Sequence, residues 1–350
     1  MGKKCGDWYH YSGAIHMHTT ESDGAKSLEE VAAIGREVGL DFLMVTDHMG
    51  LTNRERGLEG FYGSTLVLIG YEHNDLEDNN HYLIFKSPSV YPENMGAKQY
   101  VAAAHRDGAL GILAHPIENR SREGKYPPYP WTEWDTDLFD GLEIWNQMSE
   151  WMEKLTPWNK LPMALSPRKS MIGPPPGVLE IWDRLSRKRR YVGVAGVDAH
   201  AYPVKLGPLT VEIFPYKVHF RSLLTHIILD QPLASDFATA SEQVYKALAD
   251  CRVFNSNHRW GDAQEFHFSA NDGSRTAVCG DAMTFREGIT LSVELPSRAH
   301  IRLVGNGHQV ADTHGTHLEL KVREPGLYRA EVWKGRRGWI FSNHIRIGVD

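Results

Sequence analysis

The chain has 350 residues, 41% of them hydrophobic and 23% charged, and its formal net charge is −6. This composition is typical of a globular protein with one large domain and one small one, and the acidic balance disfavours nucleic-acid partners, including those of a nuclease or a polymerase-associated exonuclease. No apolar run approaches the roughly 20 residues that span a bilayer, and the start lacks the apolar core of a secretory signal, so we expect no membrane partner and a cytoplasmic location.

Segments that favour strands alternate with segments that favour helices over the first two thirds of the chain. Several of the strand segments are short apolar runs, typical of strands buried on both faces. Ser27 and Glu30 have the spacing of a capping box, and Gly39 is a helix stop. This alternation favours an α/β fold, either a barrel or a doubly wound parallel sheet. We expect strands at 14–18, 41–46, 65–70, 81–85, 109–114, 141–145, 191–197 and 209–214, and helices at 27–39, 97–108, 177–190 and 217–230.

Residues 118–176 interrupt this pattern, because they are rich in proline, tryptophan and tyrosine. Prolines at this density prevent long regular elements, and the aromatic residues argue against disorder. We therefore expect an insertion that forms a lid or a pocket wall.

After residue 257 the pattern changes to short strands separated by Gly, Pro, Asn and Asp turns. Such a pattern is typical of a small antiparallel β-sandwich. We therefore expect a barrel over residues 8–257 and a sandwich domain over residues 260–350.

The stretch "IHMHTTESDG" raises the question of a metal site, because it contains His16 and His18. Side chains two apart on a strand point to the same face, so both imidazoles can reach one ion. Asp198 and His200 repeat this spacing in "GVDAH". The recurrence of the pair at two strand ends favours metal ligands over core histidines.

Three further strands carry a metal-ligand residue at or just past their carboxyl ends. In a parallel barrel these ends meet at the active-site face. Imidazoles and carboxylates are ligands for zinc, manganese or iron, and their number exceeds what one ion needs. We expect two or three divalent ions with Glu72 as a bridging ligand. The three residues are His48, Glu72 and His115.

Other polar residues have two interpretations from sequence. Asp23 precedes Gly24, where aspartate is common as a turn residue, but its place in the motif favours a ligand. His81 begins its strand, which is the wrong end for a simple parallel barrel. His105, His219 and His226 fall in expected helices, and we expect no metal there.

The segments "HMHTTESDG", "TDH", "GYE", "AHP" and "DAH", in this order, resemble the PHP (polymerase and histidinol phosphatase) superfamily over about residues 10–230. The resemblance implies a distorted (β/α)7 TIM-like barrel that hydrolyses phosphoesters with metal-activated hydroxide at a di- or trinuclear site. It also raises His81 to an expected ligand. The implied ligands are His16, His18, Asp23, His48, Glu72, His81, His115, Asp198 and His200.

The end of the chain, "RGWIFSNHIRI", is similar to the CehA/McbA branch of this superfamily, which includes carbamate hydrolases. In that branch the segment "SN" is usually followed by proline, whereas this chain has His344. The substrate class implied by the branch is therefore open.

A phosphorylated small-molecule substrate also needs fixed positive charge, which arginine supplies bidentately. Arg120 is the main candidate, and with Asp23 and His48 it forms the expected catalytic set; surface arginines on a loop would look the same. Arg122, Arg168 and Lys205 are further candidates. Asp47 and Glu143 are candidates to orient ligand imidazoles. Four aromatic residues of the insertion would line a pocket or pack in the core, namely Tyr126, Tyr129, Trp131 and Trp134.

Three functions are therefore open from sequence. The first is a metal-dependent phosphoesterase acting on a small phosphorylated substrate. The second is a carbamate or carboxylic-ester hydrolase on the same metal site, which the aromatic insertion favours. The third is a non-catalytic metal-binding module. Such a module would be expected to lack some of the ligand residues of the motifs, and none of them is missing here. The oligomeric state is left open.

The chain contains three cysteines, Cys5, Cys251 and Cys279, which lie far apart in the sequence and form no CxxC pair. This spacing disfavours a disulfide framework and a zinc site built on thiolates.

Overall fold

The computed structural model describes residues 2–120, 127–206 and 209–349. These residues form two compact units, each assembled from separate stretches of chain. We call residues 13–171 and 195–224 the barrel unit, and residues 2–12, 172–194 and 225–350 the β unit. The predicted division into a barrel domain at residues 8–257 and a sandwich domain at residues 260–350 stays a prediction.

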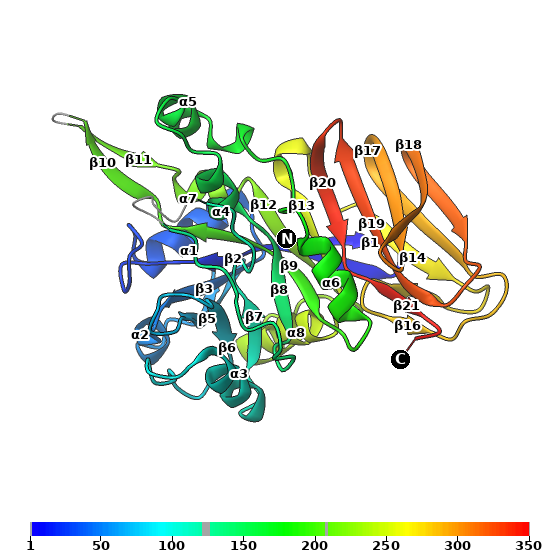
Figure 1. The fold of residues 1–350 in the computed structure, drawn as a ribbon, viewed down its shortest axis with the longest axis horizontal. Coiled ribbons are helices and arrows are strands. Elements are labelled where there is room, and N and C mark those ends of the chain that lie inside the picture. Colours follow the sequence, from blue (N-terminus) through cyan, green and yellow to red (C-terminus); the bar gives the residue numbers. More distant parts are fainter. Residues whose placement is uncertain (1, 121–126, 207–208, 350) are drawn as a thin grey trace. The chain divides into compact units, whose positions relative to one another are not determined.

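The barrel unit is built around a closed ring of seven strands within a mixed α/β fold (Figure 1). β2 pairs in parallel with β3, and β3 with β5; β7 pairs in parallel with β8, β8 neighbours β9, and β9 closes the ring by pairing in parallel with β2. The expected α/β barrel is therefore present. The ring strands are β2 (Trp8–Met17), β3 (Phe42–His48), β5 (Thr65–His73), β6 (Tyr82–Phe85), β7 (Leu110–Leu113), β8 (Gly141–Asn146) and β9 (Val192–Ala199).

β6 runs opposite to the other ring strands, because it pairs in antiparallel with both β5 and β7. The expected all-parallel sheet is wrong at this strand. Residues 74–81, all of them described, contain no helix, so β5 and β6 are joined directly. A strict (β/α)7 alternation is therefore not what the chain adopts.

The ring strands are buried because their sequences are continuous apolar runs. Every residue of β5 is buried, and so are the first six residues of β3. Around them lie α1 (Leu28–Val38), α2 (Thr52–Glu55), α3 (Ala97–Arg106), α7 (Tyr216–His219) and the short strand β4 (Gly60–Tyr62). The sequence prediction for α1 is confirmed: Ser27 and Glu30 form the capping box, and Gly39 ends the helix in the left-handed conformation at φ 83°.

We expected the proline-rich segment 118–176 to be one insertion. It is instead divided in two, because the ring strand β8 lies in its middle. The chain on the carboxyl side of β8 forms α4 (Gln147–Glu153), α5 (Lys160–Leu165) and the 3₁₀ turn η1 (Pro167–Lys169). These elements are short, as the proline content predicts.

Two other expectations from sequence need correction. The helix expected at 217–230 is wrong, because α7 ends at His219 and β12 (Leu223–Leu229) follows as a fully buried strand. A short apolar run such as "LLTHIIL" does not distinguish strand from helix by periodicity. The strand expected at 209–214 exists as β11 (Leu209–Ile213), but it pairs with β10 (Tyr202–Leu206), and Figure 1 shows this hairpin extending away from the ring.

The β unit has mostly antiparallel strands, as expected for the C-terminal region. β17 is its long central strand, with an irregular register between Glu294 and Ala299, and it pairs with β14, β18 and β19. Phe268, Ile301 and Trp339 belong to its buried core. The strands are β1 (Lys3–Cys5), β13 (Val253–Asn257), β14 (His267–Asn271), β15 (Thr276–Val278), β16 (Ala282–Met283), β17 (Thr290–Gly305), β18 (His308–Lys321), β19 (Gly326–Lys334), β20 (Arg337–Ser342) and β21 (Ile345–Ile347), with helices α6 (Val178–Ser186), α8 (Phe237–Ala249) and η2 (His258–Trp260).

His344, where the CehA/McbA branch usually has proline, belongs to a buried ion cluster in the β unit. Its Nε2 lies 2.7 Å from Asp183 Oδ1, and Arg329 donates two further hydrogen bonds to the same carboxylate at 2.7 and 2.9 Å. Although burial opposes ionisation, these partners lower the pKa of Asp183 to about 2. The histidine therefore has a structural partner within its own unit.

Throughout the part of the chain that the structure describes, each helix is too short or too polar to cross a membrane.

Candidate metal centre

The predicted ligands converge at one end of the barrel. His48 ends β3, Glu72 lies near the end of β5, and Asp198 lies near the end of β9. His81 directly precedes β6. Because β6 is antiparallel to its neighbours, its amino end lies where their carboxyl ends lie. His81, at the amino end of β6, therefore lies at the same end of the barrel as the other predicted ligands.

Glu72 is the centre of the cluster. Its carboxylate is 1% exposed and five imidazoles surround it. A single carboxylate shared by imidazoles from five places in the chain is suited to bridging adjacent cations. Oε2 lies 3.1 Å from His16 Nε2, 3.3 Å from His18 Nε2 and 3.4 Å from His48 Nδ1, and Oε1 lies 2.8 Å from His81 Nδ1 and 3.4 Å from His115 Nε2.

All nine predicted ligands belong to groups whose ligand atoms lie within 4.8 Å of one another. The groups share members, so they form one continuous cluster. They are His18, Asp23, His48 and His200; His16, His18 and Glu72; His16, His115 and Asp198; and Glu72, His81 and His115.

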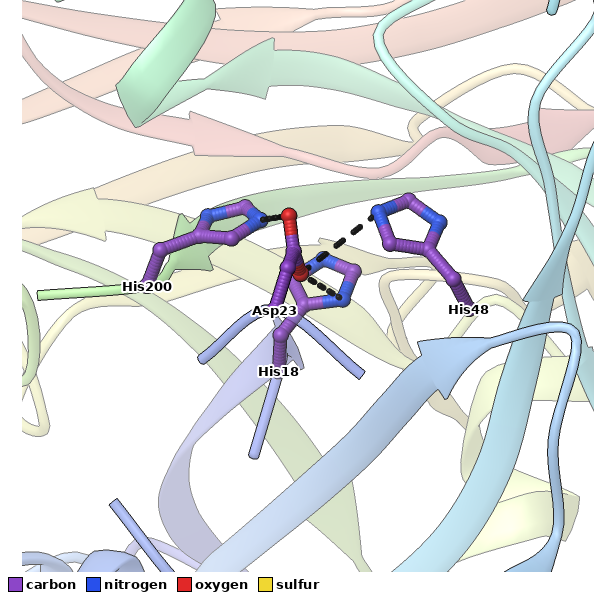
Figure 2. Close-up of side chains that lie close together, drawn as sticks. All are labelled: His18, Asp23, His48 and His200. Carbon is purple, nitrogen blue, oxygen red and sulfur yellow. Dashed lines mark ion pairs between the residues drawn. The ribbon is translucent and has the colours of Figure 1, made fainter. Parts of the chain in front are cut away.

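Figure 2 shows the outer group, in which Asp23 lies among three imidazoles. Its carboxylate is 3.2 Å from His200 Nε2, 3.7 Å from His18 Nδ1 and 3.8 Å from His48 Nε2. Asp23 is half exposed, and His48 is about one third exposed. These two side chains are therefore the ones that solvent and a substrate reach most easily.

Asp47 holds the loop that carries Asp23. It accepts hydrogen bonds from the Thr19 backbone N–H at 2.6 Å and from Ser22 Oγ at 2.8 Å, and Asn53 Nδ2 donates to its other oxygen. The expectation that Asp47 orients a ligand imidazole is wrong, since its hydrogen-bond partners are these loop and helix groups.

Glu143 does orient an imidazole, as expected. His16 Nδ1 donates to its Oε1 at 2.7 Å, while the His115 backbone N–H and Asn146 Nδ2 each donate to its Oε2 at 2.7 Å. Gly196 makes this approach possible, because a Cβ there would lie 1.7 Å from Glu143 Oε1. With Nδ1 donating to Glu143, His16 presents Nε2 to Glu72.

The backbone is strained at three of these positions. His16, His115 and Asp198 have φ angles of 69°, 26° and 52°, in a region that non-glycine residues rarely occupy. The pairing of β2 with β9 also shifts register between Ile15 and Met17, on either side of His16. Such strain clusters at functional sites, where surrounding contacts hold a side chain in an uncommon direction.

Electrostatics keep the carboxylates of the cluster ionised. Although burial opposes it, the neighbouring imidazoles hold the pKa of Glu72 well below its usual value and lower that of Asp23 to about 2. Burial and the nearby imidazoles of His200 and His48 lower the pKa of His18 to about 4. His18 is therefore a neutral imidazole between anionic oxygens at pH 7.

The donor set fits divalent cations. Both ring nitrogens of His18 are buried and make no hydrogen bond, although Nε2 lies 3.3 Å from Glu72 and 3.4 Å from Asp198. A lone pair that faces carboxylate oxygens is unfavourable unless a cation or a proton lies between them.

The cluster opens into a cavity of about 540 Å³. The cavity is lined by predicted ligands such as His48 and Glu72 and by an apolar wall. The segment 118–176 thus supplies a pocket wall, as expected. The apolar wall consists of Met148, Trp151, Met152, Leu155, Ala164, Tyr202 and Ile213.

Arg120 lines the cavity, but its charge is offset. Its Nη2 lies 2.6 Å from both oxygens of Glu118, a buried carboxylate that also accepts from Ser149 Oγ. Arg120 Nε is buried and makes no hydrogen bond. Lys160, exposed on α5, also lines the cavity.

The remaining candidates have different positions. Tyr129 lines the cavity and stacks on His81, with 5.0 Å between the ring centroids, whereas Trp131 is buried against Tyr82. Tyr129 is therefore part of the pocket, and Trp131 is part of the core. Arg168 and Trp134 are not among the described residues that line the cavity. Arg122 and Tyr126 lie outside the described residues, as does the side chain of Lys205.

Three polar residues at or beside this cavity were not predicted from sequence: Glu118, Ser149 and Lys160. For Glu118 a signal exists, because an acidic residue two positions before a candidate arginine favours an ion pair. Ser149 and Lys160 carry no motif that marks them, and the fold brings them to the cavity through α4 and α5.

Comparison with known proteins gives distant likenesses. No family model and no curated protein matches this chain. A two-domain protein from Bacteroides vulgatus that contains a predicted PHP-like metal-dependent phosphoesterase is 12% identical with a TM-score of 0.48, over 98% of this chain and 97% of that one. A protein from Bifidobacterium adolescentis, assigned as a metal-dependent phosphoesterase, is 15% identical with a TM-score of 0.34. The match covers 57% of this chain and 92% of that one.

A third structure, an amidohydrolase from Chromobacterium violaceum with bound sulfate and no metal, is 12% identical with a TM-score of 0.29, over 58% of this chain and 94% of that one. Likenesses with such low sequence identity do not assign a function to this chain.

Proposed function

We propose that the protein is a metal-dependent hydrolase of the PHP superfamily that cleaves a phosphate monoester with a small apolar leaving group. The observation that carries this proposal is the cluster of six imidazoles and three carboxylates around Glu72, open to a cavity with an apolar wall. The narrower resemblance to the CehA/McbA branch stays a prediction.

The ligand groups would hold two or three divalent ions, with Glu72 between them. A bound divalent ion lowers the pKa of water and stabilises the charge that develops on an attacked phosphoryl group. The three carboxylates and Glu143, which is hydrogen-bonded to His16, carry −4 when ionised, whereas two or three divalent ions carry +4 or +6. With three ions the net charge is about +2, which suits a phosphate dianion, and with two ions it is about zero.

The chain's own residues would bind and orient the substrate. Arg120 lines the cavity, so its guanidinium would donate to a phosphoryl oxygen of the substrate. His48 and Asp23 are the most exposed members of the cluster, so they would contact the substrate while they hold an ion. Met148 and Trp151 would contact the apolar leaving group and exclude water from it.

A carbamate or carboxylic-ester hydrolase is the second candidate. Glu118 offsets the charge of Arg120, and several side chains that line the cavity are apolar. Both features favour an uncharged substrate. The same ligand cluster would serve either reaction.

Elemental analysis paired with a hydrolysis screen tests both candidates. We would measure the metals in protein purified without added metal, and its turnover of p-nitrophenyl phosphate, p-nitrophenyl acetate and an aryl N-methylcarbamate. A His16→Ala and His18→Ala double variant should lose metal and turnover, whereas the exposed His105→Ala variant should keep both.

Preference for the phosphate substrate supports the first candidate, and preference for the acetate or carbamate supports the second. Protein that stays inactive on all three after incubation with manganese, zinc or iron contradicts both, and leaves a metal-binding module.

A further inference from the structure

A second group of potential ligands lies in the β unit, on one face of the hairpin formed by β1 and β2. In their antiparallel pairing Cys5 is opposite Trp8, and Lys3 is opposite His10. Trp8 and His10 are two apart on β2 and so share a face. Cys5 and His10 are therefore diagonal neighbours on that face.

β14 brings a second imidazole to the same place. His267 begins β14, and its ring lies 5.2 Å from the ring of Trp8. Cys5 Sγ and one ring nitrogen each of His10 and His267 lie within 4.8 Å of one another. None of these residues belongs to the barrel cluster.

His10 has the surroundings of a metal ligand. The side chain is buried, and Nδ1 lies 2.8 Å from the Gln264 carbonyl oxygen, to which it donates. Its other nitrogen, Nε2, is buried and makes no hydrogen bond. A backbone carbonyl bonded to one imidazole nitrogen fixes the tautomer that leaves the other nitrogen free to coordinate.

We propose that Cys5, His10 and His267 bind a divalent cation of the zinc class. One thiolate and two imidazoles are ligands that zinc prefers, and an unpaired buried nitrogen beside them is otherwise costly. Zinc bonds of about 2.0–2.3 Å in a tetrahedron bring ligand atoms to about 3.5 Å from one another, so atoms that lie within 4.8 Å need to close by at most about 1.3 Å. Cys5 is half buried at the end of the three-residue strand β1, and a small shift of this short strand would close the distance.

Glu294 is the natural fourth ligand. It is directly opposite His267 in the pairing of β14 with β17, and its charge acts on Cys5. The site would then tie the β1–β2 hairpin to β14, and metal binding would stabilise the β unit. The barrel cluster offers no thiolate, so the two sites have different chemistry.

Cobalt(II) is the probe that distinguishes the sites, because a thiolate ligand gives an intense near-ultraviolet charge-transfer band that imidazoles and carboxylates do not give. The full chain titrated with cobalt should show this band. It should be lost in Cys5→Ser and weakened in His267→Asn, whereas the exposed histidine variant His308→Asn should keep it. Hydrolysis in the barrel should be the same in all of these proteins.

A second measurement needs no variant. We expect zinc to slow the alkylation of Cys5 in the wild-type protein, followed by mass spectrometry, with the buried Cys251 and Cys279 as internal references. No thiolate band in the wild type, a band that survives in Cys5→Ser, or an alkylation rate that zinc leaves unchanged would each overturn the proposal.

Discussion

Replacing Glu143 by glutamine should disable the metal centre without removing a ligand. The carboxylate accepts three hydrogen bonds, one on Oε1 from His16 Nδ1 and two on Oε2 from the His115 backbone and Asn146. Glutamine offers one oxygen and one NH₂ group. The oxygen will face the two donors, so the NH₂ group will face His16 Nδ1.

His16 must then accept on Nδ1 and carry its proton on Nε2, the nitrogen that faces Glu72 at 3.1 Å. A protonated nitrogen does not bind a metal ion. Loss of an orienting partner of this kind typically costs about 10–100-fold in metal affinity or activity, which is about 1.4–2.7 kcal/mol. We expect Glu143→Gln to lose affinity and turnover by this amount.

Metal affinity would be measured by competition with a chromogenic chelator, and turnover with the substrate found in the screen. Glu59→Gln is the matched control, because Glu59 accepts one backbone N–H, from Ile69, and an amide oxygen accepts it equally well. If Glu143→Gln is folded and keeps wild-type affinity and turnover, the tautomer argument is refuted.

Three further predictions follow from single contacts. Gly196→Ala should release metal as Glu143→Gln does, since its Cβ would lie 1.7 Å from Glu143 Oε1; metal content after dialysis checks this. Arg120→Met should lower kcat/KM for a phosphate substrate by about 10–100-fold, the value of a charge-assisted hydrogen bond, and leave kcat/KM for a carboxylic ester unchanged; equal losses would contradict its phosphate role. The pKa of Asp183 is lowered to about 2, so its ion pair contributes about 2 kcal/mol to the free energy of unfolding above pH 4, and this is lost as the pH falls toward 2. Urea unfolding between pH 5 and 2 checks it, because Asp183→Asn should be less stable at pH 5 and show a smaller loss over this range.

The motifs and the family resemblance together predicted nine residues that the structure brings into one cluster. Each of His48, Glu72 and Asp198 lies at or near the carboxyl end of a buried strand, and parallel strands bring such ends together whatever the details of the loops. Local rules also predicted α1, because a capping box and a terminal glycine act within one turn of helix. The metal-binding role of these residues stays a proposal until metal content is measured.

The direction of a strand and the choice between strand and helix depend on which segments pack together. The spacing of residues in the sequence does not show this. The direction of β6 is set by its partners β5 and β7, so the position of His81 at the cluster followed from pairing rather than from its own sequence. The run at 223–229 is strand because its neighbours are strands, since an apolar run of that length satisfies either periodicity.

The sequence by itself therefore determined which imidazoles and carboxylates stand at the strand ends of the barrel, because strand ends and residue types are local properties. Tertiary structure decided the shape of the cavity, the pairing of Arg120 with Glu118, and the meeting of Cys5 with His267 across more than half the chain. Spacing rules recognise a thiolate site when its ligands are close in sequence. They do not apply to Cys5, because the site combines β1 and β2 with β14, which lies far away in the sequence. The hydrogen-bonded neighbours of these strands fix where each side chain lies.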